Sequence, residues 1–255
     1  MQVRLDQDIR IRALTEHAEF ERCAALQDEV WSYEPEQRMT EKVYLLASHI
    51  GGQVLGAFDG ETLAGYAMSL PGIREGRPYL HSHHLAVLPA YRNGGVGRRL
   101  KLAQREEALG RSLTLMEWTF DPLEIRNAHL NIARLGVIVR RYARNFYGES
   151  ASPLHGGLPT DRIVAEWWMR SEHVDRALVG DRKVFEPVLE RVTIPAEISE
   201  WKSAEATREK AREVQQRNAD ALSDAFARGL AVIGFERTER GEGVYLLGEW
   251  KEESR

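Results

Sequence analysis

The sequence of 255 residues has a single cysteine, Cys23, so it can form neither an intrachain disulfide nor a Cys-x-x-Cys metal site. One cysteine suits a reducing, cytoplasmic setting, because disulfides are rare there. No stretch approaches the roughly 18 consecutive apolar residues of a membrane helix. The first residues show no apolar segment typical of a signal peptide. We therefore expect a cytoplasmic protein without a membrane partner.

The chain also lacks an excess of positive charge. It has 35 Lys and Arg against 39 Asp and Glu, which gives a formal net charge of −4. Sequence-independent nucleic-acid binding needs a large basic surface, so we expect no nucleic-acid partner. The length and a hydrophobic content of 43% suffice for a full core without disulfides or metal. The chain fits one large domain, or one domain with a smaller appended part.

Apolar periodicity predicts alternating strands and helices over the first two-thirds of the chain. The Asp59-Gly60 pair between two apolar runs indicates a hairpin, and Pro71-Gly72 should end its second strand. Asp121-Pro122 is typical of an N-cap followed by proline at the first helical position. Expected strands cover residues 10–14, 54–58, 62–70, 79–87, 113–120, 137–139 and 162–169, and expected helices cover 17–31, 96–110 and 121–135.

The region after residue 170 has a different composition. Residues 203–228 read as one long charged helix, which follows an apolar-alternating piece at 184–194. Two short apolar runs, 231–235 and 244–247, come after it. We predict a domain over residues 1–170 and an appended β-α-β-β module over residues 171–255.

The most informative segment is a strand that leads through a basic, glycine-rich turn into a helix. Amides in the first turn of a helix have no partner within the helix and, with the helix dipole, form an anion site. Arg92, Arg98 and Arg99 add positive charge, so a diphosphate fits this turn. A Walker A loop is excluded because the turn has no lysine. A dinucleotide fingerprint is excluded because Leu100 occupies its third glycine position.

The remaining pattern is Arg-x-x-Gly-x-Gly, met by Arg92, Gly95 and Gly97, after Leu85-x-Val87-x-Pro89. With the order of elements around it, this pattern resembles the acyl-CoA site of the GNAT N-acetyltransferase superfamily. The resemblance covers about residues 8–170. It implies an α/β (α+β) fold with a mixed, mostly antiparallel sheet flanked by helices.

The resemblance also implies acetyl-CoA or another acyl-CoA as co-substrate. The motif amides would hold the pyrophosphate, and the preceding strand would offer backbone groups to the pantetheine arm and the acyl carbonyl. Asn131 would hydrogen-bond the pantetheine. The implied cofactor-binding residues are Leu85, Ala86, Val87, Arg92, Asn93, Gly94, Gly95, Val96, Gly97, Arg98 and Asn131.

An acceptor amine is protonated at neutral pH, so a base must take a proton before attack. His83, His84 and Glu117 lie on the strands where this family commonly carries its base. Strand alternation places His81 and His83 on one face and Ser82 and His84 on the other.

A second motif of this family, which follows the acyl-CoA site in the chain and carries a tyrosine, is incomplete in this sequence. Ile132 stands where the family carries the tyrosine that protonates the leaving thiolate. Tyr142 and Tyr147 are candidate substitutes, although a thiolate can leave without a protein acid. Arg141 or Arg162 could pair with a substrate carboxylate.

We expect direct transfer of an acetyl or other short acyl group, such as succinyl, to a primary amine of a small molecule, such as an amino acid. The alternative is a non-catalytic acyl-CoA sensor or interaction protein. A homodimer is compatible with the long charged helix. His81, His83 and His84 lack further ligands at diagnostic spacing, so we expect no metal. We expect Cys23 to be a core residue.

Overall fold

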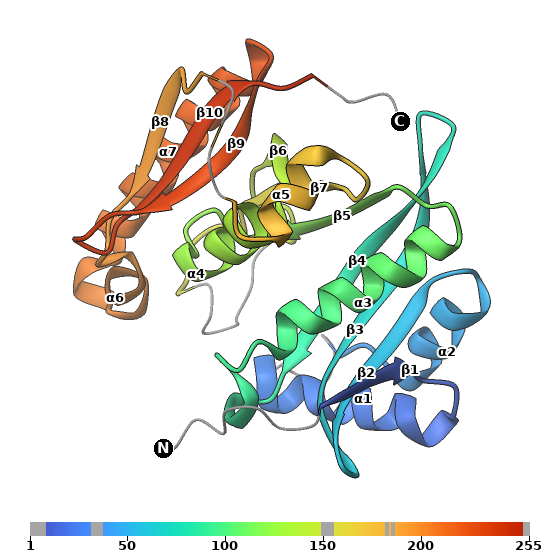
Figure 1. The fold of residues 1–255 in the computed structure, drawn as a ribbon. Coiled ribbons are helices and arrows are strands. Elements are labelled where there is room, and N and C mark those ends of the chain that lie inside the picture. The colour runs from blue at the N-terminus through green and yellow to red at the C-terminus, as the bar shows by residue number, and fades with distance from the viewer. Residues whose placement is uncertain (1–8, 32–37, 149–155, 182–183, 185–186, 252–255) are drawn as a thin grey trace. The chain divides into compact units, whose positions relative to one another are not determined.

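The structure is a computed structural model that describes residues 9–31, 38–148, 156–181, 184 and 187–251 (Figure 1). It comprises two compact units, Met1–Met116 and Glu117–Arg255, which are described in turn. Across the described ranges, no helix combines the length and the apolar character that a membrane span requires.

The first unit is built on an antiparallel sheet whose strands neighbour one another in chain order. These strands are β1 (Arg10–Ala13), β2 (Gln53–Asp59), β3 (Thr62–Arg74) and β4 (Arg77–Val87). The hairpin predicted at Asp59-Gly60 joins β2 to β3, because Asp59 pairs directly with Thr62. The predicted strands and this turn are confirmed.

The predicted end of β3 at Pro71-Gly72 is wrong. The strand continues to Arg74 and turns back through Glu75 and Gly76, which both have positive φ angles of 51° and 76°. Positive φ at both turn residues matches the right-handed twist of a two-residue hairpin. Proline is tolerated because the β2–β3 pairing ends at Gln53 and Ser69, so β3 beyond that pair lies at an edge.

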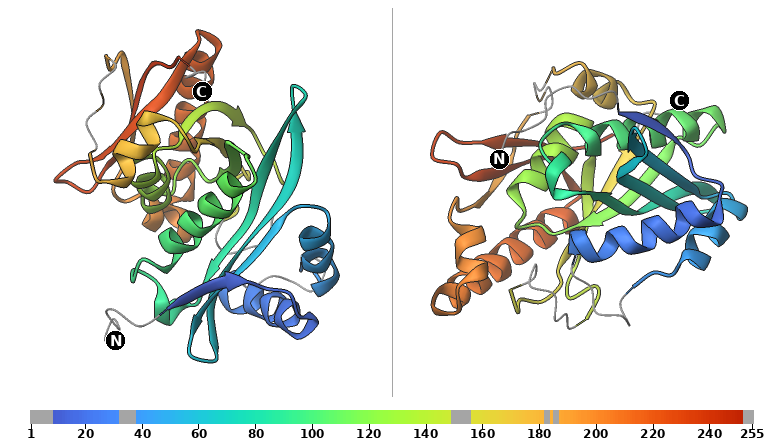
Figure 2. Two further views of the ribbon diagram at one scale, coloured as in Figure 1. Left: turned by 45° about the vertical axis from the view of Figure 1, so that its right-hand side comes forward. Right: turned by 90° about the horizontal axis from the view of Figure 1, so that it is seen from below.

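Helices cover both faces of this sheet. Helices α1 (His17–Trp31) and α2 (Glu41–His49) lie on one face, and α3 (Val96–Gly110) lies on the other (Figure 2). The predictions for α1 and α3 are confirmed, whereas α2 was not predicted. Its N-cap is Thr40, a residue type that favours helix starts, although its side chain makes no capping bond.

Each face has its own apolar cluster. The first cluster joins α1 and α2 to the sheet and contains Phe20, Cys23, Leu26, Tyr44, Phe58, Tyr66 and Met68. The second joins α3 to the sheet and contains Leu55, Ala57, Ala64, Ala67, Val96 and Leu100. Cys23 is fully buried, and burial raises the pKa of its thiol to about 12, so its prediction as a core residue is confirmed.

The second unit contains a further run of antiparallel strands. Its strand order is β7-β6-β9-β10-β8, with β6 (Ile138–Ala143) paired to both β7 (Arg162–Trp168) and β9 (Leu230–Arg237). Strand β10 (Gly243–Glu249) lies between β9 and β8 (Glu190–Ile194). Strand β5 (Leu115–Phe120) begins at the border of the two units.

Helices complete the second unit. The long helix α7 (Arg208–Ala227) packs against β6, β8 and β9 and follows α6 (Ile198–Ser203) and a 3₁₀ turn, η5 (Glu205–Thr207). Helix α5 (Glu172–Leu178) follows β7. The predicted β-α-β-β order is found in β8, α7, β9 and β10. The sheet nevertheless continues from β9 into β6 at the Val139–Val232 pair.

The compact units divide after residue 116, whereas the sequence placed a domain boundary after residue 170. Compactness is a different property from the extent of a catalytic domain, so the division into residues 1–170 and 171–255 stays a prediction. The mixed α/β class, with a mostly antiparallel sheet flanked by helices, is confirmed.

The helix predicted over residues 121–135 starts later than expected. Asp121 Oδ1 accepts a hydrogen bond from the Leu123 amide at 2.8 Å, which forms a local turn and not a helix cap. Helix α4 (Ile125–Ala128) begins after Glu124 and continues as a π-helix, η3 (His129–Arg134).

Gly52 gives a test of packing in the first unit, because a Cβ there would lie 2.2 Å from the Ser69 carbonyl oxygen. We expect Gly52→Ala to lower the free energy of unfolding by about 1–3 kcal/mol in urea denaturation. Gly110 in α3 has nothing within 4 Å of such a Cβ, so Gly110→Ala should be neutral or slightly stabilising. Equal effects of the two substitutions would contradict this packing.

Candidate functional site: the glycine turn and strand β4

The turn between β4 and α3 leaves the first backbone amides of a helix open to a ligand. Strand β4 ends at Val87, a 3₁₀ turn, η2 (Pro89–Tyr91), follows, and α3 starts after Gly95. Gly95 is the N-cap, has a φ of 80°, and leaves the first helical turn without a side-chain cap. A Cβ at Gly95 would meet nothing within 4 Å, so the space before the helix is open.

Glycine is required at this N-cap because φ lies in the left-handed region. The first intrahelical bond runs from the Arg99 amide to the Gly95 carbonyl at 3.0 Å. The preceding amides, those of Gly95, Val96 and Gly97 among them, have no acceptor within the helix. Together with the helix dipole they favour an anion such as a phosphate.

The arginines of the turn have different roles. Arg92 Nε donates to the Val87 carbonyl at 3.1 Å, so its side chain folds back over the end of β4. Arg99 Nη2 donates to the Ile9 carbonyl at 2.5 Å and joins α3 to the segment before β1. Arg92 is exposed, so its charge remains available at the turn.

A β-bulge interrupts β4 at His83. Met68 pairs with His84 and the next residue, Ser69, pairs with Ser82, so His83 is the extra residue. The bulge reverses the alternation that the sequence predicted, and Ser82 and His84 point to opposite faces of the sheet. The prediction that they share a face is therefore wrong.

Ser82 faces α3. Lys101 Nζ donates to Ser82 Oγ at 2.7 Å, and Ser82 Oγ donates to Gln104 Oε1 at 3.0 Å. Burial lowers the pKa of Lys101 well below its usual value. All three side chains are buried, so this network stabilises α3 on the sheet and gives a substrate no access.

His84 faces α1 and α2 in a buried cluster with two tyrosines. Tyr66 Oη lies 3.0 Å from His84 Nδ1 and 2.7 Å from Tyr44 Oη. The Trp31 ring lies 4.7 Å from the imidazole, centroid to centroid. Burial, with a smaller effect from His83, lowers the pKa of His84 to about 3. His84 is therefore neutral at neutral pH and a weak base.

His83 stacks on His84, with ring centroids 4.7 Å apart and an interplanar angle of 13°. It is half-buried, and burial lowers its pKa from the usual 6.5. A half-buried neutral imidazole is better suited to accept a proton at neutral pH than His84. Sequence reasoning missed Tyr44 and Tyr66, since nothing in their local sequence marks them as partners of a histidine.

Glu117, in the second unit, belongs to a group of paired charges. Arg141 Nη2 lies 2.6 Å from Glu117 Oε1, and Arg141 Nε lies 3.4 Å from Glu166 Oε1. Arg140 Nη2 lies 2.5 Å from Glu166 Oε2. A bulge between Val139 and Tyr142 lets both arginines reach Glu166. Two carboxylates thus balance two guanidinium groups.

Tyr142 is bound to Asp161, because its hydroxyl donates to Asp161 Oδ2 at 2.6 Å. Burial and this carboxylate raise the pKa of Tyr142 far above its usual value. Tyr147 is about half exposed, and its hydroxyl lies 3.0 Å from Thr119 Oγ1 on β5.

Asn131 lies in the π-helix η3 and is 3% exposed. Its backbone carbonyl accepts from the Val137 amide at 3.1 Å. Its Nδ2 has no hydrogen-bond partner within the described part of the chain. A buried amide donor of this kind needs a partner from outside the chain, such as water or a ligand.

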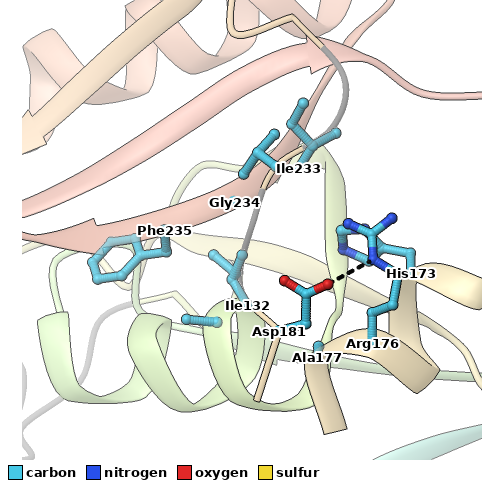
Figure 3. Close-up of a pocket in the computed structure, with 10 residues that line it drawn as sticks. Ile132, His173, Arg176, Ala177, Asp181, Ile233, Gly234 and Phe235 are labelled. Atoms are coloured by element: carbon cyan, nitrogen blue, oxygen red, sulfur yellow. Dashed lines mark ion pairs between the residues drawn. The ribbon is translucent and has the colours of Figure 1, made fainter. Parts of the chain in front are cut away.

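A small cavity in the second unit does not fit a cofactor. Its volume of about 30 Å³ is that of a water molecule or two, and it lies between η3, α5 and β9 (Figure 3). Arg176 Nε and Asp181 Oδ2 form an ion pair of 3.5 Å at its wall. Among the residues that the structure covers, no three His, Cys, Asp or Glu side chains form a group that could hold a metal ion.

Residues 21–131 match the family described as the acetyltransferase (GNAT) family. The chain contains a GNAT acetyltransferase domain. The matched residues include all of β4, the glycine turn and α3, so the glycine turn lies inside the GNAT domain. No curated protein matches the chain significantly.

Solved structures share the GNAT fold at low sequence identity. The ribosomal-protein-S18-alanine N-acetyltransferase from Escherichia coli has a TM-score of 0.51 and 16% identity, over 64% of this chain and 97% of its own. The yncA protein of Salmonella typhimurium, described as an acetyltransferase and solved with its cofactor acetyl-CoA, has a TM-score of 0.52 and 16% identity. That match covers 64% of this chain and 95% of the Salmonella chain.

The His84 cluster of the GNAT domain should make stability depend on pH. The unfolded chain binds a proton at His84 near pH 6.5, whereas the folded chain binds it only near pH 3. The contribution of neutral His84 to the free energy of unfolding is therefore fully present above pH 6.5 and is lost as the pH falls towards 3. We expect His84→Gln to reduce the slope of the free energy of unfolding against pH, measured by urea denaturation, by up to about 1.4 kcal/mol per pH unit in this range. An unchanged slope would contradict the assignment.

Proposed function

We propose that this protein is an acyl-CoA-dependent N-acyltransferase that moves an acetyl group from acetyl-CoA to a primary amine of a small molecule. The observation that carries the proposal is the uncapped N-terminus of α3, where Gly95 opens an amide-lined anion site at the end of β4. This geometry suits the pyrophosphate of a CoA thioester.

The residues present fit that group in three respects. The amides of residues 92–98 and the charge of Arg92 would hold the pyrophosphate. In an antiparallel pair, alternate residues direct their backbone N–H and C=O groups away from the partner strand. Some of these groups in Leu85, Ala86 and Val87 would therefore hydrogen-bond the pantetheine arm. The unpartnered Nδ2 of Asn131 would donate to the pantetheine. When bound, acetyl-CoA supplies the activated acyl group as a thioester.

The acyl group is best taken as acetyl, since the Salmonella typhimurium protein of the same fold was solved with acetyl-CoA. A longer group such as succinyl remains the alternative. It would need an unpaired cation near the acyl pocket, and Arg141 is already engaged by two carboxylates.

His83 is the residue best suited as general base among the candidates. Glu117 is held by Arg141, and the buried Nδ1 of His84 is engaged by Tyr66. In the proposed reaction, His83 takes a proton from the ammonium group, and the amine nitrogen then attacks the thioester carbonyl. A backbone amide of β4 stabilises the oxyanion. The C–S bond then breaks to release CoA thiolate, and the former amine nitrogen, which is positively charged after the attack, loses its second proton to the thiolate or to water. Tyr142 donates to Asp161, so the thiolate leaves without this acid.

Binding to the glycine turn is the first test. We expect saturable binding of acetyl-CoA and CoA in calorimetry, and we expect Gly95→Glu to abolish it, because a carboxylate would then occupy the anion site. Gly76→Glu is the matched control, since Gly76 has a similar φ of 76° and open space around its Cβ position.

Failure of the wild type to bind any CoA species would refute the proposal. Binding without turnover across a broad panel of amines would instead favour a non-catalytic acyl-CoA sensor.

The base assignment is tested by kinetics at saturating amine. We expect His83→Gln to lower kcat by about 10²–10⁴-fold, whereas His81→Gln on the same strand should retain activity. In the wild type, kcat should fall as the pH drops through the His83 pKa, which lies below 6.5. A wild-type profile that is flat below pH 6.5 would assign the base to another group.

A further inference from the structure

The C-terminal segment is fastened to two loops of the second unit that lie far from it in sequence. We define the C-terminal brace as residues 198–249, from α6 to β10. The first loop, 121–124, joins β5 to α4, and the second, 156–161, leads into β7.

Lys202 in α6 makes the first connection. Its Nζ lies 2.7 Å from Asp121 Oδ2 and 2.8 Å from Glu124 Oε1. Lys202 is 5% exposed, and burial alone would lower its pKa, but the two carboxylates outweigh burial and raise it. The ammonium group is therefore charged and joins the two ends of the first loop.

The backbone of the same residue makes the second connection. A Cβ at Gly156 would lie 2.2 Å from the Lys202 carbonyl oxygen, and Gly156 has a φ of 56°. Only glycine permits this close approach between the second loop and α6. One residue thus contacts both loops, one through its side chain and the other through its backbone.

Two further contacts join the brace to these loops, and a third joins it to the end of β6. Tyr245 Oη on β10 donates to the Pro122 carbonyl at 2.7 Å. Gln215 Nε2 on α7 donates to the Pro159 carbonyl at 2.9 Å. Arg144, which follows β6, pairs with Asp220 on α7 at 2.6 Å.

The first loop supports a residue of the proposed site, and the second loop holds two tyrosines in and just after β6. Loop 121–124 leads directly into α4 and the π-helix that carries Asn131. In loop 156–161, Asp161 accepts from Tyr142, and Thr160 Oγ1 accepts from the Tyr147 amide at 2.9 Å. Movement of either loop would displace these side chains.

We infer that the C-terminal brace holds loops 121–124 and 156–161 in place for the transfer reaction, and that Lys202 is its central positioning residue. The role in the reaction rests on the proposed function, whereas the mechanical role does not. Lys202 touches no reacting atom in this scheme.

Hydrogen exchange on the full chain tests the mechanical role. We expect Lys202→Met to speed amide exchange in both loops about tenfold or more, with no change in residues 38–115. Lys202→Arg keeps the charge and should largely restore slow exchange. Lys210→Met is the matched control, because Lys210 is exposed near the start of α7. Unchanged exchange in Lys202→Met, or equal acceleration over all of residues 117–251, would overturn the brace.

A second pair of variants separates the backbone contact from the charge. Gly156→Ala should speed exchange in loop 156–161 while loop 121–124 keeps its rate. Gly157→Ala carries a similar strain, with a φ of 72°, but its Cβ would lie 3.7 Å from the nearest atom. If Gly157→Ala speeds exchange as much as Gly156→Ala, the contact with Lys202 is not the cause.

Kinetics test the role in the reaction, at a temperature where circular dichroism shows each variant fully folded. Lys202→Met should lower kcat about tenfold. The Kd of Lys202→Met for acetyl-CoA should stay within about fivefold of the wild-type Kd, because the proposed pyrophosphate site lies in the first unit. A fivefold change corresponds to the loss of one hydrogen bond, such as that of Asn131. Wild-type kcat in Lys202→Met would overturn the positioning role. If the wild type itself turns over no amine, the proposed function fails. The hydrogen-exchange data still test whether the C-terminal brace holds the two loops.

Discussion

The bulge at His83 is the local constraint on which the arrangement of β4 depends. One extra residue reverses the alternation of the strand, so that Ser82 contacts α3 and His84 contacts the α1 and α2 side. The same change stacks the His83 ring on His84 and leaves it half-buried. After the bulge, Leu85 and Val87 face α3, where each lies 3.8 Å from the position of a Cβ on Gly97. A single irregularity in the pairing thus fixes both the position of the candidate base and the packing of β4 against the start of α3.

The buried polar side chains of β4 form separate hydrogen-bond networks on the two faces of the sheet in the first unit. On the α3 side, Lys101 and Gln104 hold Ser82, and on the other side two tyrosines hold His84. An unpaired polar group in a protein interior costs free energy. These networks therefore favour the one placement of the helices in which the polar groups meet their partners. The open N-terminus of α3 is the contrast, because its amides face unfilled space in front of Gly95 and are suited to a ligand.

In the second unit, sheet pairing and side-chain contacts join the C-terminal elements to the earlier strands and loops. Strand β9 joins β6, and Lys202, Gln215 and Tyr245 reach the loops before α4 and β7. An extension of this kind cannot be removed without exposing an edge of β6 and leaving Asp121 and Glu124 without their cation. The C-terminal residues are thus integral to the second unit.

The sequence by itself determined the mixed α/β class, most strands, the helices α1 and α3, and the glycine turn, because these depend on local periodicity and on turn chemistry. Gly95 and Gly97 after a strand are sufficient to indicate an anion-binding helix start. Only the tertiary structure decided the faces of Ser82 and His84, because a bulge depends on pairing with β3 and leaves no local signal. It also decided that Tyr142 donates to Asp161 and that Lys202 pairs with Asp121, contacts between residues 19 and 81 positions apart. Such long-range contacts follow from how strands and helices pack, and a local pattern of residues does not encode them.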